Sequence, residues 1–87
     1  MARYRLVFRR SVAKDLRSLP HRDVARILKV FDVLSLDPRP FGCEKLSGME
    51  RYRIRQGIYR IVYEIMDDEL VIRVVKVGHR REVCRNL

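Results

Sequence analysis

The chain has 87 residues, of which 47% are hydrophobic and 36% charged, and its formal net charge is +9. This size and composition exclude a disordered chain and allow one domain, over residues 1–87, with a modest single core. No apolar run approaches the roughly 18 residues of a membrane span, and the N-terminal segment MARYRLVFRR lacks the apolar core of a signal peptide, so we expect a cytosolic protein.

One strand and two helices are predicted in the first half of the chain. Residues 3–8 alternate apolar and basic side chains, as an opening strand does. Ser11 is a candidate N-cap for a short helix that ends before Pro20. Apolar residues recur with i, i+3, i+4 and i+7 spacing over residues 24–34, which indicates an amphipathic helix. The two helices should form an antiparallel hairpin with one shared apolar side, and the prolines and glycines of residues 37–48 predict a loop.

A β-hairpin is predicted around Gln56-Gly57, which suits a two-residue turn. Arginine alternates with large apolar residues before the turn, and IYRIVYEI continues as strand after it. With this turn Arg53 lies opposite Arg60. Alternation then puts the neighbouring tyrosines and isoleucines on one face and Arg53, Arg55 and Arg60 on the other. Like charges placed opposite each other destabilise a sheet, so three guanidinium groups on one patch indicate a polyanionic ligand.

A last long strand is predicted over residues 70–78, after a turn at residues 66–69, because this segment is rich in β-branched residues. With a short connecting loop, Tyr63 lies opposite Ile72, and the apolar face continues for the helices to pack on. The other face then carries Arg53, Arg55, Arg60 and Arg73 among Ile58, Val62, Val71, Val75 and Val77. We interpret this mixed face as a binding surface. The alternative is a sheet face partly covered by the C-terminal residues.

The positive charge comes from 16 arginines and four lysines. Such an excess favours nucleic acid, an acidic protein or an anionic membrane as partner, and a guanidinium group can hold phosphate through two hydrogen bonds. A GC-rich genome, whose codons favour arginine, is the alternative explanation of the arginine bias. Cys43 and Cys84 lack the spacing of a zinc site, so we expect neither a metal nor, in a reducing compartment, a disulfide.

The order of strands and helices, together with four sequence segments, resembles the RelE/ParE superfamily of bacterial toxins over essentially the whole chain. The segments are KLSG at 45–48, YRIR at 52–55, GIYRIVYEI at 57–65 and VKVGHRREV at 75–83. The resemblance implies an α+β fold with the order β-α-α-β-β-β, in which a two-helix hairpin packs on one face of a mostly antiparallel four-stranded sheet. The RelE branch is the closer one.

The RelE resemblance also implies an activity and partners. Such toxins belong to type II toxin–antitoxin systems and cleave messenger RNA in the ribosomal decoding site, without a metal or other cofactor. A cognate acidic antitoxin protein neutralises them. The alternative is a ParE-like toxin, which poisons DNA gyrase by binding and has no nuclease activity. A plain nucleic-acid-binding module would explain the charge but not the concentration of arginines on one sheet face.

Carried over position by position, the resemblance implies catalytic roles for four arginines. Arg53 and Arg55 occupy two places where RelE-type nucleases often carry lysines. Arg60 matches the most characteristic catalytic arginine of the family, and Arg80 matches the arginine that follows the last long strand. These side chains could stabilise the charge that develops when a ribose 2′-hydroxyl attacks its adjacent phosphate and leaves a 2′,3′-cyclic phosphate.

Further positions are expected to contact ribosomal or messenger RNA. Lys45 matches a basic position of the family, and Arg81 and Arg85 extend the basic C-terminal segment. Cys84 is also expected at the RNA, but it departs from the family pattern. RelE-like enzymes commonly carry there a tyrosine that stacks on the substrate base, and a thiol cannot stack.

The proton transfer needs another group, because arginine cannot act as a base at neutral pH. The candidates on the sequence are His79, Glu82, Tyr52 and the Cys84 thiol. His79 is the catalytic candidate among them, since histidine ordinarily exchanges protons near neutral pH. The alternative is that His79 only contacts phosphate, and that Glu82 pairs with an arginine.

Overall fold

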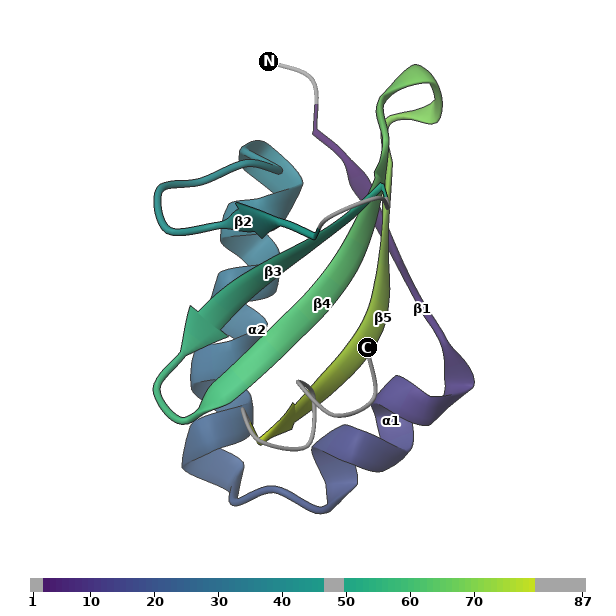
Figure 1. Ribbon diagram of the computed structural model, residues 1–87. Helices are drawn as coiled ribbons and strands as arrows, with labels where there is room; N and C mark the ends of the chain where they lie inside the picture. Colours follow the sequence, from purple (N-terminus) through teal and green to yellow (C-terminus); the bar gives the residue numbers. More distant parts are fainter. Residues whose placement is uncertain (1–2, 47–49, 80–87) are drawn as a thin grey trace.

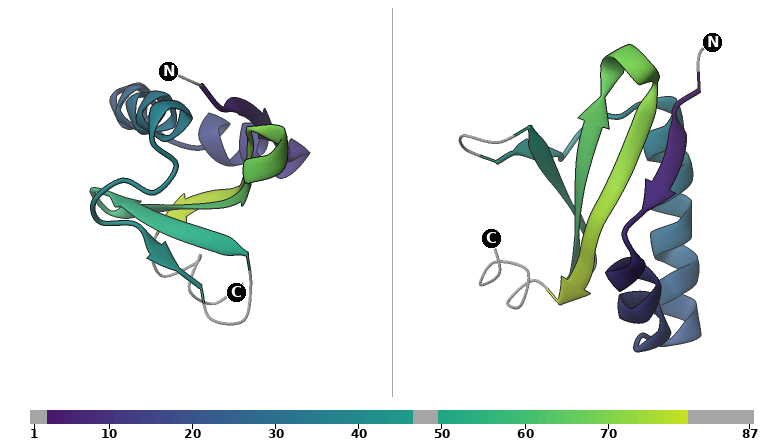
Figure 2. Two further views of the ribbon diagram at one scale, coloured as in Figure 1. Left: turned by 90° about the horizontal axis from the view of Figure 1, so that it is seen from above. Right: turned by 90° about the vertical axis from the view of Figure 1, so that its right-hand side faces the viewer.

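Five strands form one sheet, and two helices cover one face of it (Figures 1 and 2). The computed structural model describes residues 3–46 and 50–79. The elements are β1 (Arg5–Phe8), α1 (Arg10–Arg17), α2 (His21–Leu36), β2 (Glu44–Lys45), β3 (Arg51–Gln56), β4 (Tyr59–Met66), the short 3₁₀ helix η1 (Asp67–Glu69) and β5 (Val71–His79). Neither α1 nor α2, in this described part of the chain, has the length and apolar character to cross a bilayer.

The sheet order is β1-β5-β4-β3-β2, with antiparallel neighbours except for β1, which runs parallel to β5. The predicted α+β fold and the mostly antiparallel sheet are therefore confirmed. The sheet has five strands rather than four, because Glu44 and Lys45 pair with Arg53 and Tyr52 where a loop was predicted. A strand of two residues has no periodicity that a sequence pattern could reveal.

Helix α1 begins and ends slightly away from its predicted positions. Ser11 is not the N-cap of α1, because the helix already begins at Arg10 and Arg9 takes the cap position. The backbone N–H of Arg9 still donates to the Val74 carbonyl of the sheet, so the chain turns directly from β1 into the helix. α2 begins at His21, immediately after Pro20.

The main core lies between α2 and the sheet. The predicted apolar stripe of α2 is confirmed at Ile27, Phe31 and Leu34, which are buried, but not at Leu28, which is 49% exposed. The three buried residues pack in one cluster with buried residues of α1 and of the sheet, which are Val12, Tyr52, Tyr59, Ile61, Tyr63, Ile65, Ile72, Val74 and Val77. Alternation on β3 and β4 consequently sends the intervening arginines to the opposite face.

The turn of the β3–β4 hairpin is Gly57-Ile58, not the predicted Gln56-Gly57, because Gln56 pairs with Tyr59. Gly57 has φ = 59°, and a two-residue turn of type II′ requires a positive φ at its first position, which glycine adopts without strain. Arg60 thus lies opposite Arg55 rather than Arg53. Moving the turn by one position changes the partners but keeps each side chain on its predicted face.

A β-bulge changes the pairing of β4 with β5. Tyr63 lies opposite Val74 and not Ile72, and Val62 lies opposite Lys76, so Val75 is an extra residue. Because of the extra residue, side chains beyond a bulge face the side opposite to the one that uninterrupted alternation would give them. The side chain of Val77 therefore enters the main core, whereas the sequence pattern placed it on the arginine-bearing face.

Helix α1 supports the edge of β5 beyond the bulge. β1 pairs with β5 only from Val71 to Val74. Further along, the carboxylate of Asp15 accepts a hydrogen bond from the backbone N–H of Val77 at 3.3 Å and one from Lys76 Nζ at 3.2 Å. An acidic side chain of α1 thus takes the place of a neighbouring strand for one backbone donor.

Replacing Asp15 with alanine should lower the free energy of unfolding by about 1–3 kcal/mol, because a part-buried backbone donor loses its acceptor. Asp15→Asn keeps an oxygen for the Val77 N–H and should be less destabilised. Asp32→Ala, on the exposed side of α2, is the control. Urea unfolding of the three variants measures the difference. Equal losses in Asp15→Ala and Asp15→Asn would assign the effect to the ion pair with Lys76 instead.

Candidate functional site

Three of the predicted arginines line one hollow on the sheet face opposite the helices. This arginine pocket has a volume of about 390 Å³ and is lined by Phe41, Gly42, Glu44, Arg53, Ile54, Arg55 and Arg60. β3 supplies Arg53 and Arg55, and β4 supplies Arg60 from the position opposite Arg55. The structure therefore brings Arg53, Arg55 and Arg60 together as the alternation of the hairpin predicted.

A carboxylate lies among these guanidinium groups. Glu44 on β2 is paired with Arg53 on β3, and its Oε2 accepts a hydrogen bond from Arg53 at 2.5 Å. This hydrogen bond and the charge of Arg53 lower the pKa of the Glu44 carboxyl below its ordinary value of 4.5, and the charges of Arg60 and Arg55 lower it further. Glu44 is thus ionised at neutral pH, and the pocket keeps an excess of positive charge.

The loop between α2 and β2 brings Phe41 and Glu44 to the pocket and is fixed to the sheet by Arg39. The Arg39 guanidinium donates to both carboxylate oxygens of Asp67, at 3.4 and 2.9 Å, and through Nε to the Tyr52 hydroxyl at 3.2 Å. It also lies over the Tyr52 ring, 5.2 Å from the centroid. These contacts hold the loop against the helix-bearing side of the sheet.

Two backbone contacts complete the support of this loop. The hydroxyl of Tyr63 donates to the Pro38 carbonyl at 2.8 Å, and burial raises the pKa of that hydroxyl, which stays protonated. The N–H of Cys43 donates to the Pro40 carbonyl at 3.1 Å, and Gly42 between them has φ = 93°. These two features define a tight turn from Pro40 to Cys43 with a positive φ at its third residue, as in type II. Glycine adopts this φ without strain, which explains why residue 42 is a glycine.

The other predicted residues of the described chain lie outside the arginine pocket. Lys45 is paired with Tyr52, so it leaves β2 on the side opposite Glu44, and its Nζ contacts Glu50 at 3.4 Å. His79 is paired with Tyr59 on β4 and thus leaves β5 on the face of the Tyr59 ring, opposite to that of Arg60. Tyr52 is buried in the main core.

Five predicted positions lie outside the described residues: Arg80, Arg81, Glu82, Cys84 and Arg85. Their expected roles therefore stay predictions. Within residues 3–46 and 50–79, no three side chains of the metal-binding types come together.

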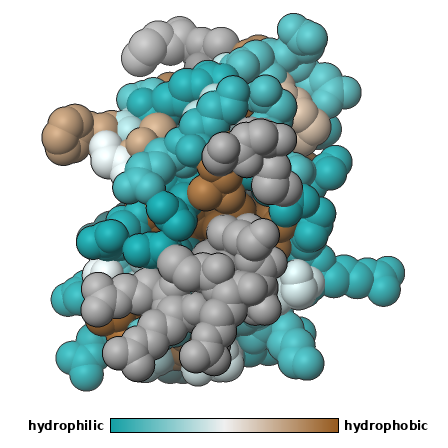
Figure 3. Space-filling view, viewed as in Figure 1, coloured by the Kyte–Doolittle hydropathy of each residue, from teal (hydrophilic) through white to brown (hydrophobic). Residues whose placement is uncertain are grey.

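The remainder of the arginine-bearing face has an apolar centre. Val62 and Val75 are buried there, with Leu46 packed against them. The space-filling view of this side shows hydrophobic surface within a largely hydrophilic face (Figure 3). The predicted mixture of arginine and apolar side chains is present, without Val77.

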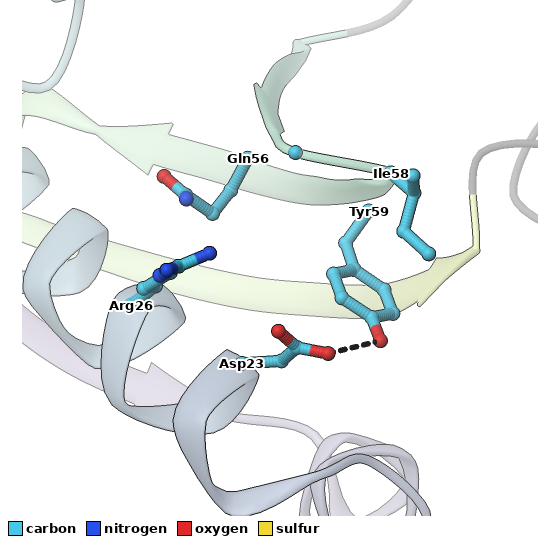
Figure 4. A pocket seen from close by; sticks show the side chains of 6 residues that line it. Asp23, Arg26, Gln56, Ile58 and Tyr59 are labelled. Carbon is cyan, nitrogen blue, oxygen red and sulfur yellow. Dashed lines mark hydrogen bonds between the residues drawn. The ribbon is translucent and has the colours of Figure 1, made fainter.

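A smaller pocket of about 220 Å³ lies where the β3–β4 turn meets α2 (Figure 4). Its walls include Asp23, Arg26 and Gln56, and the hydroxyl of Tyr59 donates to Asp23 Oδ2 at 2.7 Å. This hydrogen bond to a carboxylate raises the pKa of the Tyr59 hydroxyl. The contact ties the hairpin to the first turn of α2, so we assign this pocket a structural role.

Sequence reasoning missed Phe41, Gly42 and Glu44 as residues of the arginine pocket. Glu44 directly precedes the KLSG segment, and its nearness to a basic motif was the available signal. Phe41 follows a proline in a loop segment, where a large apolar residue is unexpected. Phe41 is fully exposed.

Comparison with known proteins finds similarity along nearly the whole chain. The family described as ParE toxin of type II toxin-antitoxin system, parDE, matches residues 6–84. The toxin RelG of Mycobacterium tuberculosis is 30% identical over 86 residues, which cover 94% of this chain and 97% of RelG.

Solved structures of RelE toxins superpose well on this fold. RelE in the archaeal RelE–RelB complex from Pyrococcus horikoshii OT3 gives a TM-score of 0.81 at 35% identity, over 92% of this chain and 97% of that chain. The isolated RelE toxin of E. coli gives 0.77 at 29% identity, over 97% and 99%. Both alignments cover nearly the whole of each chain and therefore include the hairpin that carries the arginine pocket.

Proposed function

Because the chain belongs to the RelE/ParE superfamily and is a toxin of a type II toxin–antitoxin system, we propose that it inhibits translation by cleaving ribosome-bound messenger RNA. The observation that carries this proposal is the arginine pocket, which combines three guanidinium groups with one ionised carboxylate. A phosphate diester that cleaves itself through a 2′-hydroxyl needs both charge stabilisation and a proton acceptor, and needs no nucleophile from the protein.

Arg53, Arg55 and Arg60 stabilise the negative charge that develops on the phosphate. Their guanidinium groups can donate to the non-bridging oxygens of the phosphate, where negative charge increases as the 2′-oxygen attacks. Arg55 and Arg60 lie directly opposite each other on neighbouring strands, an arrangement that an anion between them would stabilise. We place Arg80 in the same role from its sequence position.

In this proposal Glu44 takes the proton of the 2′-hydroxyl as the 2′-oxygen bonds to phosphorus. The P–O5′ bond breaks, and the departing 5′-oxygen takes up a proton from water. Among the pocket residues Glu44 carries the one side chain that is an anionic acceptor at neutral pH. Its low pKa makes it a weak base, but neighbouring guanidinium groups also lower the barrier by stabilising the pentavalent phosphorus species. His79 stays an alternative acceptor, although its strand position directs it to the other face.

Mapping the messages of growing bacteria that express the chain tests the activity. We expect breaks within translated codons, produced only when ribosomes are engaged, because the substrate must be aligned in the decoding site. The competing function is ParE-like gyrase poisoning, which the similarity to RelG and to the RelE toxins does not favour. Growth arrest with double-strand DNA breaks and intact messages would replace the nuclease by that function.

We also propose a cognate acidic antitoxin as the neutralising partner. The similar RelE of Pyrococcus horikoshii was solved in complex with RelB. The net charge of +9 would speed association with an acidic protein. A groove of about 500 Å³ between α2 and β3 offers apolar walls, with Val30, Val33 and Ile54, beside the cations of Arg26 and Lys29.

Contacts with ribosomal RNA are proposed for Lys45, Arg81 and Arg85. Such a toxin would act in the cytoplasm, where the ribosomes are.

A further inference from the structure

We propose that Phe41 is a substrate-binding residue that stacks on a nucleobase of the RNA held in the arginine pocket. This inference rests on the proposed nuclease function and adds a base-binding site to it. Phe41 lines the same pocket as Glu44 and the three arginines. A nucleotide whose phosphate lies among those arginines therefore has an exposed aromatic side chain beside it.

The exposure of Phe41 is unusual because its backbone is held in place. Single exposed apolar side chains are common on protein surfaces, and exposure alone would mean little. Phe41, however, occupies the second position of the tight turn between Pro40 and Cys43, next to Gly42 at φ = 93°. Arg39, immediately before this turn, is anchored to Asp67 and Tyr52. A ring presented from a fixed turn loses little freedom on binding, which strengthens stacking.

The rest of the described chain provides no other aromatic ring at this pocket. Tyr52, Tyr59 and Tyr63 belong to the main core, on the helix-bearing side. Proteins that bind single-stranded RNA combine cations along the phosphates with aromatic rings under the bases. Phe41 would supply that ring here, where Cys84 replaces the stacking tyrosine that the resemblance led us to expect.

An apolar contact with a protein is the competing role for Phe41, because the ring also borders the apolar groove beside α2. The charged neighbours of the ring favour a nucleotide.

The stacking itself can be measured without cleavage, because the chain contains no tryptophan. Phe41→Trp introduces a single fluorophore at the pocket. The probe is a short RNA oligonucleotide with 2′-O-methyl riboses, which cannot react through a 2′-hydroxyl, and its matched analogue without bases. We expect the RNA with bases to quench the fluorescence of the introduced indole and the abasic analogue, with the same number of phosphates, to leave it unchanged. Val33→Trp, in the apolar groove only, should not respond to either.

Cleavage of ribosome-bound messages by further variants measures what the stacking contributes. Phe41→Ala and Phe41→Leu should both be slower than wild type by roughly 5- to 150-fold, and Phe41→Tyr should stay near wild type, because only an aromatic ring offers a stacking face. Full activity of Phe41→Leu, or equal quenching by the abasic probe, would overturn the proposal and assign Phe41 to an apolar contact. If even the wild type cleaves no message, the nuclease function fails, and base-dependent quenching still decides whether Phe41 binds bases.

Discussion

Replacing Arg60 with alanine is expected to slow message cleavage about 10²- to 10³-fold, the usual loss when one well-placed electrostatic donor is removed from a reacting oxygen. The growth arrest caused by the toxin should disappear with it. The fold should persist, because Arg60 lies on the arginine-bearing face and not in the main core between α2 and the sheet. The three measurements are the rate of cleavage by purified toxin on programmed ribosomes, the growth of cells that express the variant, and its thermal unfolding curve.

Arg73→Ala is the matched control for Arg60→Ala. It removes the same charge from the same face, but Arg73 pairs with Glu64 at 3.5 Å and does not line the arginine pocket. Its cleavage rate should stay near that of the wild type. A folded Arg60→Ala protein that is as active as Arg73→Ala would show that the pocket is not the site. The double variant Arg55→Ala/Arg60→Ala should lose less than the product of the single losses, since the two facing side chains would bind one phosphate.

The grouping of the arginines was predictable from the sequence, whereas their partners were not. The assignment of side chains to faces depends only on alternation, which any turn with an even number of residues preserves. The position of the turn depends on which residue adopts a positive φ, and Gly57 does so at the first turn position. Arg60 consequently meets Arg55 instead of Arg53.

The bulge in β5 shows a second limit of periodicity. Every second residue of a continuous β-branched segment looks equally suited to either face, so an inserted residue leaves no mark in the pattern. Val75 is such a residue, and Val77 consequently packs in the main core. The sequence predicted the strand correctly and placed Val77 on the wrong face.

The acidic and aromatic parts of the candidate site could not be predicted from periodicity at all. Glu44 reaches Arg53 through a two-residue strand, and Phe41 reaches the pocket through a loop fixed by Arg39. Both positions depend on contacts between residues far apart in the chain. The candidate bases on the sequence therefore lie at residues 79–84 and at Tyr52, whereas the carboxylate that pairs with Arg53 in the structure is Glu44.

Glu44→Gln is expected to reduce cleavage by about 10²- to 10⁴-fold, the typical contribution of a general base. The amide has nearly the shape of the carboxylate but cannot take the 2′-hydroxyl proton at neutral pH. Glu50→Gln is the control, because Glu50 pairs with Lys45 at 3.4 Å and does not line the arginine pocket. It makes the same change of charge on the other side of the KLSG segment and should remain active.

The pH dependence separates Glu44 from the other candidate bases. A base with a lowered pKa is fully deprotonated above its ordinary value of 4.5 and becomes protonated only as the pH falls through the lowered value. Wild-type cleavage should therefore show no acidic decline between about pH 6 and pH 8. A decline with a midpoint near neutral pH would instead indicate His79, and activity rising towards about pH 8.5 would indicate the Cys84 thiol.

The direction of the Glu44→Gln effect distinguishes catalysis from simple pairing. If Glu44 served only as the partner of Arg53, its removal would leave the arginine pocket more positive, and the binding of a phosphate would become tighter. The variant would then cleave as fast as wild type or faster. If Glu44 accepts the proton, RNA binding should strengthen while the rate of cleavage falls. Tighter binding of the non-cleavable 2′-O-methyl RNA together with slower cleavage of ribosome-bound message is therefore the result we expect. Slower cleavage with weaker binding would mean that the amide has disrupted the positions of the arginines.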